Sequence, residues 1–250
     1  MGSTGFKGGI GAEVKDSVHP VWMTEMRRFY QRFPRLLRAQ FDKEAKAANL
    51  VASARSSFPN TWKTVGDEII FCCRVCRSDH LVCIMNAFIQ ALAEYGDVLE
   101  KNGGHLDVKG TAWLAAFPSP NITVEMSSDD QRSFSIFPDE QMESRADIAP
   151  HEFDFLGKSI DCGFRLGKFS SADKFALSVE LALALCEAAE SNGHRFIGVF
   201  NYDGRTELRG VLAGHPYPIV TIDTQRSAMR RRVLKKKWPS RGVRRWMQHI

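Results

Sequence analysis

Ten residues, from Trp62 to Phe71, have the pattern of a strand, a tight turn and a second strand. Gly66 permits a turn backbone that a side chain would resist. Asp67 is then expected at the tip of a rigid hairpin, where its carboxylate could bind a hard cation such as Mg²⁺. The turn therefore predicts one ligand of a metal site.

A second segment, residues 154–165, gathers polar groups behind another glycine. Asp154 opens it, Gly157 forms the turn, and Asp161 and Arg165 follow on one short run. An arginine can balance charge that develops on a phosphoryl group, and a nearby metal ion can neutralise a leaving phosphate. Together with the hairpin, this segment predicts a phosphoryl-transfer site.

These two motifs resemble those of class III nucleotidyl cyclases, which carry Lys-x-x-Gly-Asp followed by an Asp-x-x-Gly motif that ends in Arg. The resemblance implies that Asp67 binds the metals and that Lys63 and Asp154 recognise the base. It also implies that Arg165 stabilises the transition state. Asp161 stands where the family has an Asn. Because a carboxylate only accepts hydrogen bonds, whereas Asn also donates them, the contact that purine cyclases make there is altered.

The resemblance extends, more weakly, to both ends of the domain. Residues 208–211 and 216–220 are similar to a closing hairpin of the family, in which Arg209 would contact the triphosphate. Residues Ser3, Thr4, Gly5 and Phe6 would belong to a glycine loop, Gly2–Gly11, that also cradles phosphate. The family's first metal aspartate would then precede Met1 by two residues, which leaves the first strand truncated, the sheet edge incomplete and the chain weakly active.

The general likeness is greatest to the pyrimidine cyclases of bacterial Pycsar anti-phage systems. That likeness implies UTP or CTP as substrate, with UTP favoured, a cyclic nucleotide that a downstream effector senses, and two Mn²⁺ or Mg²⁺ ions per site. It also implies a head-to-tail homodimer. Each site would take Asp67 from one subunit and Lys63, Asp154, Asp161 and Arg165 from the other.

Composition is that of an ordinary globular protein of 250 residues, with 44% hydrophobic and 25% charged residues. No apolar run approaches the ~18 residues of a membrane helix, and scattered cysteines suit a reducing cytoplasm. The net charge of +5 hides an asymmetry, because ten of the 34 Lys and Arg, and no Asp or Glu, lie after residue 225. We therefore expect a catalytic domain over residues 1–224 and a basic extension over 225–250.

Periodicity predicts an α/β or α+β fold with helices packed on one sheet. Helices are expected over about 19–50, where Pro34 should kink or divide the helix, over 81–101, and from an N-cap at Ser178 to Ser191. Strands are expected on both sides of the Gly66–Asp67 turn, over 106–117 and 175–177, and in a closing hairpin over 195–223. Residues 118–148 are expected to form a long insertion or lid.

Alternative functions remain open. A purine cyclase, or a degenerate cyclase fold that binds nucleotide without turnover, would show the same motifs. The basic extension, with Trp238 and Trp246, could instead bind nucleic acid, although docking on the acidic core is favoured. Diguanylate cyclases are excluded, because they have a second glycine where this chain has Val65. A zinc site at Cys72, Cys73 and Cys76 is disfavoured, because no second ligand pair follows.

Overall fold

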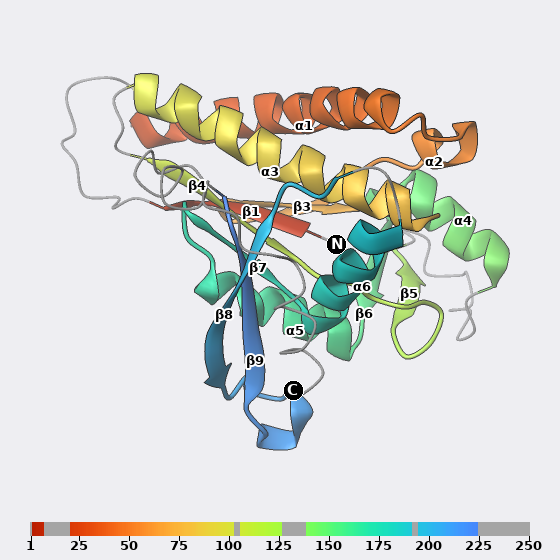
Figure 1. The fold of residues 1–250 in the computed structure, drawn as a ribbon. Coiled ribbons are helices and arrows are strands. Elements are labelled where there is room, and N and C mark those ends of the chain that lie inside the picture. Colours follow the sequence, from red (N-terminus) through yellow and green to blue (C-terminus); the bar gives the residue numbers. More distant parts are fainter. Residues whose placement is uncertain (1, 8–20, 103–105, 127–138, 192–194, 225–250) are drawn as a thin grey trace.

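A seven-stranded sheet forms the centre of the computed structural model (Figure 1). The structure describes residues 2–7, 21–102, 106–126, 139–191 and 195–224. The strand order is β2-β3-β1-β4-β7-β9-β8, and each neighbouring pair is antiparallel except β4 and β7. The strands are β1 (Gly2–Lys7), β2 (Asn60–Val65), β3 (Glu68–Cys72), β4 (Asp107–Ala112), β7 (Lys174–Leu177), β8 (Val199–Thr206) and β9 (Tyr217–Asp223).

Helices cover both faces of this sheet (Figure 1). The long helices α1 and α3 lie together on one face and α5 lies on the other, beside a two-stranded sheet of β5 and β6. These elements are α1 (Val21–Ala47), α2 (Ala52–Ser56), α3 (Ser78–Lys101), β5 (Ile122–Glu125), α4 (Glu140–Ile148), β6 (Phe153–Leu156), α5 (Lys158–Leu166) and α6 (Val179–Ser191). Short 3₁₀ turns occupy Pro150–Glu152, Gly167–Phe169 and Leu212–Gly214.

The strands alternate strictly between the two faces. On β3, Ile69 and Phe71 join the large core beneath α1 and α3, whereas Ile70 and Cys72 join a second core on the face of α5. This is the period-two pattern of a strand whose two faces are both covered. The second core is the smaller one, and it supports the candidate site.

Most of the expected elements are confirmed. The hairpin around Gly66 and Asp67 and the antiparallel pair at the end of the domain are both present. Ser178 caps α6 as predicted, because its hydroxyl accepts a hydrogen bond from the backbone N–H of Leu181 at 3.3 Å. Pro34 lies inside α1 without dividing it. The expected insertion contains β5 and α4.

The expectation for the start of the chain was wrong. Residues Gly2–Lys7 form a strand in the interior of the sheet, paired with β3 on one side and β4 on the other, instead of a glycine loop beside a gap. Glycines weaken a strand, but a slot between two strands hydrogen-bonds the backbone on both sides, which outweighs that cost. Gly5 lies opposite Glu68, so β1 runs toward the Gly66–Asp67 turn.

By length and composition alone, helix α3 could span a membrane. However, 72% of its most apolar 18-residue stretch is buried within the fold. Leu81, Phe88 and Leu92 belong to the large core between α1 and the sheet. Its apolar character is therefore that of a core helix.

Candidate functional site

The turn between β2 and β3 presents Asp67 to solvent. Gly66 has a φ of +58°, and the space around its Cα is open, so the glycine serves the backbone conformation and not close packing. The hydroxyl of Tyr30, on α1, donates a hydrogen bond to the carbonyl of Gly66. This bond ties the turn to the long helix and holds Asp67 at a fixed place.

Two further charged residues, Glu68 next to Asp67 and Lys109 on β4, were not foreseen as part of the site. Glu68 is half-buried on β3, where it lies opposite Gly5 of β1. Burial raises the pKa of Glu68, Lys109 lowers it, and Asp67 raises it further. The ammonium of Lys109 donates to the carbonyl of Gly167 at 3.0 Å. Strand alternation places Glu68 and Lys109 on the face of the sheet that α5 covers. The same alternation in the sequence could have indicated that both residues point toward the site.

The two sequence motifs meet in an ion pair. Lys63 Nζ lies 2.7 Å from Asp154 Oδ1, although 91 positions separate the residues. Both side chains are about one-third exposed, at 37% and 30%. The pair is therefore accessible to a ligand while its geometry is fixed by the fold.

Trp62 supports both members of this pair. A β-bulge at this point turns Trp62 inward, where it is 3% exposed, and leaves the Lys63 ammonium 3.9 Å from the centroid of its ring. The indole N–H donates to the carbonyl of Phe153 at 2.9 Å, and the ring packs edge-on against Phe155, 5.0 Å between centroids. Asp154 lies between those two residues, so one side chain positions the whole pair.

Helix α5 begins at a cap supplied by a distant loop. Its N-cap residue is Gly157, with a φ of +144° and no side chain to accept a hydrogen bond. The buried amide of Asn121 takes this role, because its Oδ1 accepts from the backbone N–H of Ser159 at 3.2 Å. A Cβ on Gly157 would collide with that amide. The glycine in the motif is thus required for conformation and for space.

The same helix carries Asp161 and Arg165. Asp161 is exposed in the first turn, and Arg165 is half-buried at the end. A Cβ on Gly210 would lie 3.7 Å from Arg165 Nη2, so the guanidinium approaches the loop between β8 and β9. Arg209, the expected triphosphate contact, is exposed in that loop. The Nε of Arg165 is buried and has no hydrogen-bond partner among the described residues.

Gly163 allows α5 to pack closely against the second core. A methyl group there would overlap the buried ring of Trp113, which also contacts Phe164 with ring centroids 5.5 Å apart. We expect Gly163→Ala to displace α5 and to lower the free energy of unfolding by about 1–3 kcal/mol. Chemical denaturation should show this loss, with Gly167→Ala as a comparison, because Gly167 has a φ of −54° and an added Cβ would meet only Thr111 Oγ1, at 3.9 Å. An unchanged stability for Gly163→Ala would contradict the packing described.

The structure brings Lys63 and Asp154 together but does not join them to Asp67. Among the described residues, Asp67 makes no hydrogen bond or ion pair with the other predicted site residues. No group of three His, Cys, Asp or Glu residues that could hold a metal ion occurs in the described part of the chain. For Ser3, Thr4, Gly5 and Phe6 the structure describes only the backbone, which lies in β1.

Comparisons with known proteins bear on the fold. No protein-family model matches the sequence, and no curated protein matches it. The crystal structure of the adenylyl cyclase CyaB from P. aeruginosa is similar over 88% of this chain and 91% of that chain, with a TM-score of 0.51 and 12% identity. The chain therefore has the fold of a class III cyclase domain, as the resemblance implied.

Two other cyclase structures match with lower scores. The guanylyl cyclase Cya2 has a TM-score of 0.40 and 12% identity, with 89% of each chain covered. The guanylate cyclase domain of RhGC from Catenaria anguillulae has a TM-score of 0.42 and 11% identity, covering 88% of this chain and 94% of that chain. At these scores, we base no argument on either of them.

Proposed function

We propose that this protein is a nucleotidyl cyclase that converts a pyrimidine nucleoside triphosphate, with UTP favoured, to a 3′,5′-cyclic monophosphate and pyrophosphate. The observation that carries the proposal is the ion pair of Lys63 and Asp154. A cation and a carboxylate, both partly exposed and held on one aromatic ring, offer a donor and an acceptor to the edge of a base. The cyclase fold provides the context for this interpretation.

The reaction exchanges one phosphorus–oxygen bond for another. The 3′-oxygen of the ribose loses its proton and bonds to the α-phosphorus, and the bond from that phosphorus to pyrophosphate breaks. Arg165 would balance the charge that grows on the phosphoryl group. Arg209 would contact the triphosphate, and Asp161 would accept a hydrogen bond from the ribose.

Asp67 would hold the metal ions. Mg²⁺ is usually bound by one or two carboxylates together with substrate phosphates, so one exposed carboxylate at a fixed turn fits part of such a site. When bound, Mg²⁺ or Mn²⁺ would supply Lewis-acid stabilisation of the attacking and leaving oxygens. The absence of a contact between Asp67 and Arg165 favours a composite site, in which a homodimer supplies each residue from a different subunit.

The pyrimidine preference rests on the likeness to the Pycsar cyclases, together with the departure from the purine-cyclase pattern at Asp161. A carboxylate at this position cannot donate a hydrogen bond, as the Asn of the purine cyclase pattern does. With the likeness to Pycsar cyclases, this leads us to propose a cytoplasmic second-messenger role in anti-phage defence, with a downstream effector that senses the product. The basic extension, residues 225–250, lies outside the described residues.

The decisive experiment offers each of the four nucleoside triphosphates to the full chain with Mn²⁺ and identifies the products by mass spectrometry. We expect cyclic UMP as the main product, and we expect Asp154→Asn to lose this selectivity. Faster formation of cyclic AMP or cyclic GMP would establish the purine alternative. Nucleotide binding without any cyclic product would establish the other alternative, a degenerate cyclase fold that binds nucleotide without turnover.

A further inference from the structure

A cavity of about 560 Å³ lies at the end of the sheet remote from the Gly66–Asp67 turn. Its walls are the segment that follows β3, the segment that follows β4, the first turns of α3 and α6, and helix α4. Its size is that of pockets that bind small organic molecules. None of the residues predicted for the cyclase site lines it.

The floor of this cavity is apolar. Residues from β3, α3, β6, α6 and the segment after β4 meet there, and all are buried in the large core or the second core: Phe71, Leu81, Ile84, Met85, Phe88, Trp113, Phe155 and Leu181. Such a floor favours a ligand with a hydrocarbon or aromatic body.

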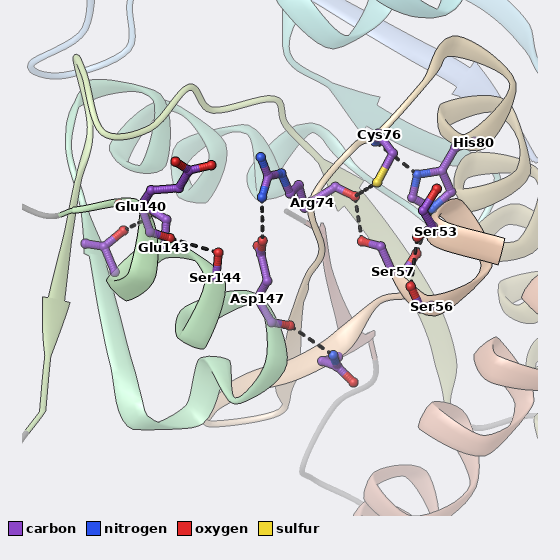
Figure 2. A network of polar contacts seen from close by, with 12 residues as sticks. Ser53, Ser56, Ser57, Arg74, Cys76, His80, Glu140, Glu143, Ser144 and Asp147 are labelled. Carbon is purple, nitrogen blue, oxygen red and sulfur yellow. Dashed lines mark hydrogen bonds and ion pairs between the residues drawn. The ribbon is translucent and has the colours of Figure 1, made fainter. Parts of the chain in front are cut away.

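The wall formed by α4 is acidic. Asp139, Glu140, Glu143 and Asp147 line it, and Arg74 is the one cationic residue of the lining in the described part of the chain. Figure 2 shows Arg74 reaching from the segment after β3 toward Asp147 on α4, where Nη1 and Oδ2 are 3.7 Å apart. This separation is longer than a hydrogen bond, so Arg74 offsets only part of the negative charge of the wall.

The carboxylate of Glu143 is compensated only in part. One of its oxygens accepts a hydrogen bond from Thr123 at 2.9 Å, whereas Oε1 is buried and has no partner among the described residues. Burial also raises the pKa of Asp147, Arg74 lowers it, and the nearby Glu143 raises it further. Two carboxylates in a partly desolvated wall, Glu143 and Asp147, therefore share a single cation, Arg74, among the described residues.

We propose that this cavity binds a small organic cation, an amine or a guanidinium with an apolar body. The body would occupy the apolar floor, and the cationic group would pair with Glu143 and Asp147. Charge-assisted hydrogen bonds to these carboxylates would then offset the negative charge that Arg74 leaves uncompensated in the wall. This site goes beyond the proposed function, because binding there requires no nucleotide.

Two wall residues connect the cavity to the candidate base site. Phe155 follows Asp154 on β6 and packs on Trp62, which lies beneath Lys63. Trp113 contacts Phe164, the neighbour of Arg165 on α5. A ligand that fixes Phe155 and Trp113 would therefore stabilise one arrangement of the side chains that carry the ion pair, which makes the cavity a place for regulation.

Three probes that share one apolar body test the proposal: 4-phenylbutylamine, 4-phenylbutan-1-ol and 4-phenylbutyrate. Calorimetric titration of the full chain should show that the amine binds at least ~10-fold more tightly than the alcohol, since hydrogen bonds to charged groups are worth more than neutral ones. The butyrate should bind more weakly still. Equal affinity for the amine and the alcohol would overturn the assignment of a cation.

Variants locate the binding site. Glu143→Gln keeps the side-chain shape and should weaken amine binding at least ~10-fold. Glu152→Gln removes the same charge from an exposed residue outside the cavity and should leave binding unchanged. Ala116→Trp, at an exposed position of the lining, should obstruct the cavity and abolish binding. If Glu143→Gln does not fold, unaltered amine binding by Ala116→Trp would by itself overturn the proposal.

Discussion

Replacing Asp67 by alanine is expected to lower the rate of nucleotide cyclisation by at least ~1,000-fold. The change removes the carboxylate proposed to hold the metal ions, which contribute several kcal/mol of transition-state stabilisation, and each 1.4 kcal/mol is a factor of ten in rate. Product formation by the purified variant at matched Mn²⁺ measures the effect.

The fold should survive this substitution. Asp67 is exposed, and the positive φ of the turn is provided by Gly66, so the free energy of unfolding should change by no more than about 0.5 kcal/mol. Asp97→Ala, at an exposed position of α3, is the matched control and should retain full activity. Activity of Asp67→Ala close to that of the unaltered chain would remove Asp67 from the metal site.

Replacing Arg165 by alanine is expected to reduce kcat by about 100- to 1,000-fold with little change in KM. A group that balances charge only as the phosphoryl group transfers acts on the transition state and not on the bound substrate. Arg165→Lys should recover part of the rate, because it keeps the charge but loses the planar fork of donors. A raised KM with an unchanged kcat would show that Arg165 only holds substrate.

The two inactive variants together test the composite site. In an equal mixture of Asp67→Ala and Arg165→Ala, half of the dimers combine one subunit of each kind, and one of their two sites receives both functional residues. About one quarter of the original activity should therefore return. If subunits exchange and the mixture still shows no recovery of activity, each site takes Asp67 and Arg165 from the same subunit.

The hairpin and the second motif could be predicted because their signals are local. A glycine turn fixes Asp67 by backbone conformation alone, and the pattern from Asp154 to Arg165 needs only a turn and one helix. The family resemblance implied that Lys63 and Asp154 act on the same base, and the structure places them 2.7 Å apart. The first strand was predicted wrongly because glycines indicate a loop, whereas pairing with β3 and β4 decides the conformation of Gly2–Lys7.

Other features depend on contacts that no local pattern encodes. Asn121 caps a helix that begins 37 positions later in the chain, and Trp62 supports Asp154 through the backbone of the neighbouring residue. The acidic wall opposite an apolar floor arises only when α4 packs against the end of the sheet. Distant residues create each of these features, so the sequence offered no spacing from which to infer them.

In the ion pair of Lys63 and Asp154, each residue competes with the base for the other's hydrogen bonds. Each residue already satisfies the other at 2.7 Å, so a base gains only the difference between its own hydrogen bonds and the pair that it replaces. A base whose edge matches both groups loses nothing by the exchange, whereas one that matches a single group leaves the second charge without a partner. Discrimination would then come from the penalty imposed on the mismatched nucleotide, and weak overall affinity would accompany sharp selectivity.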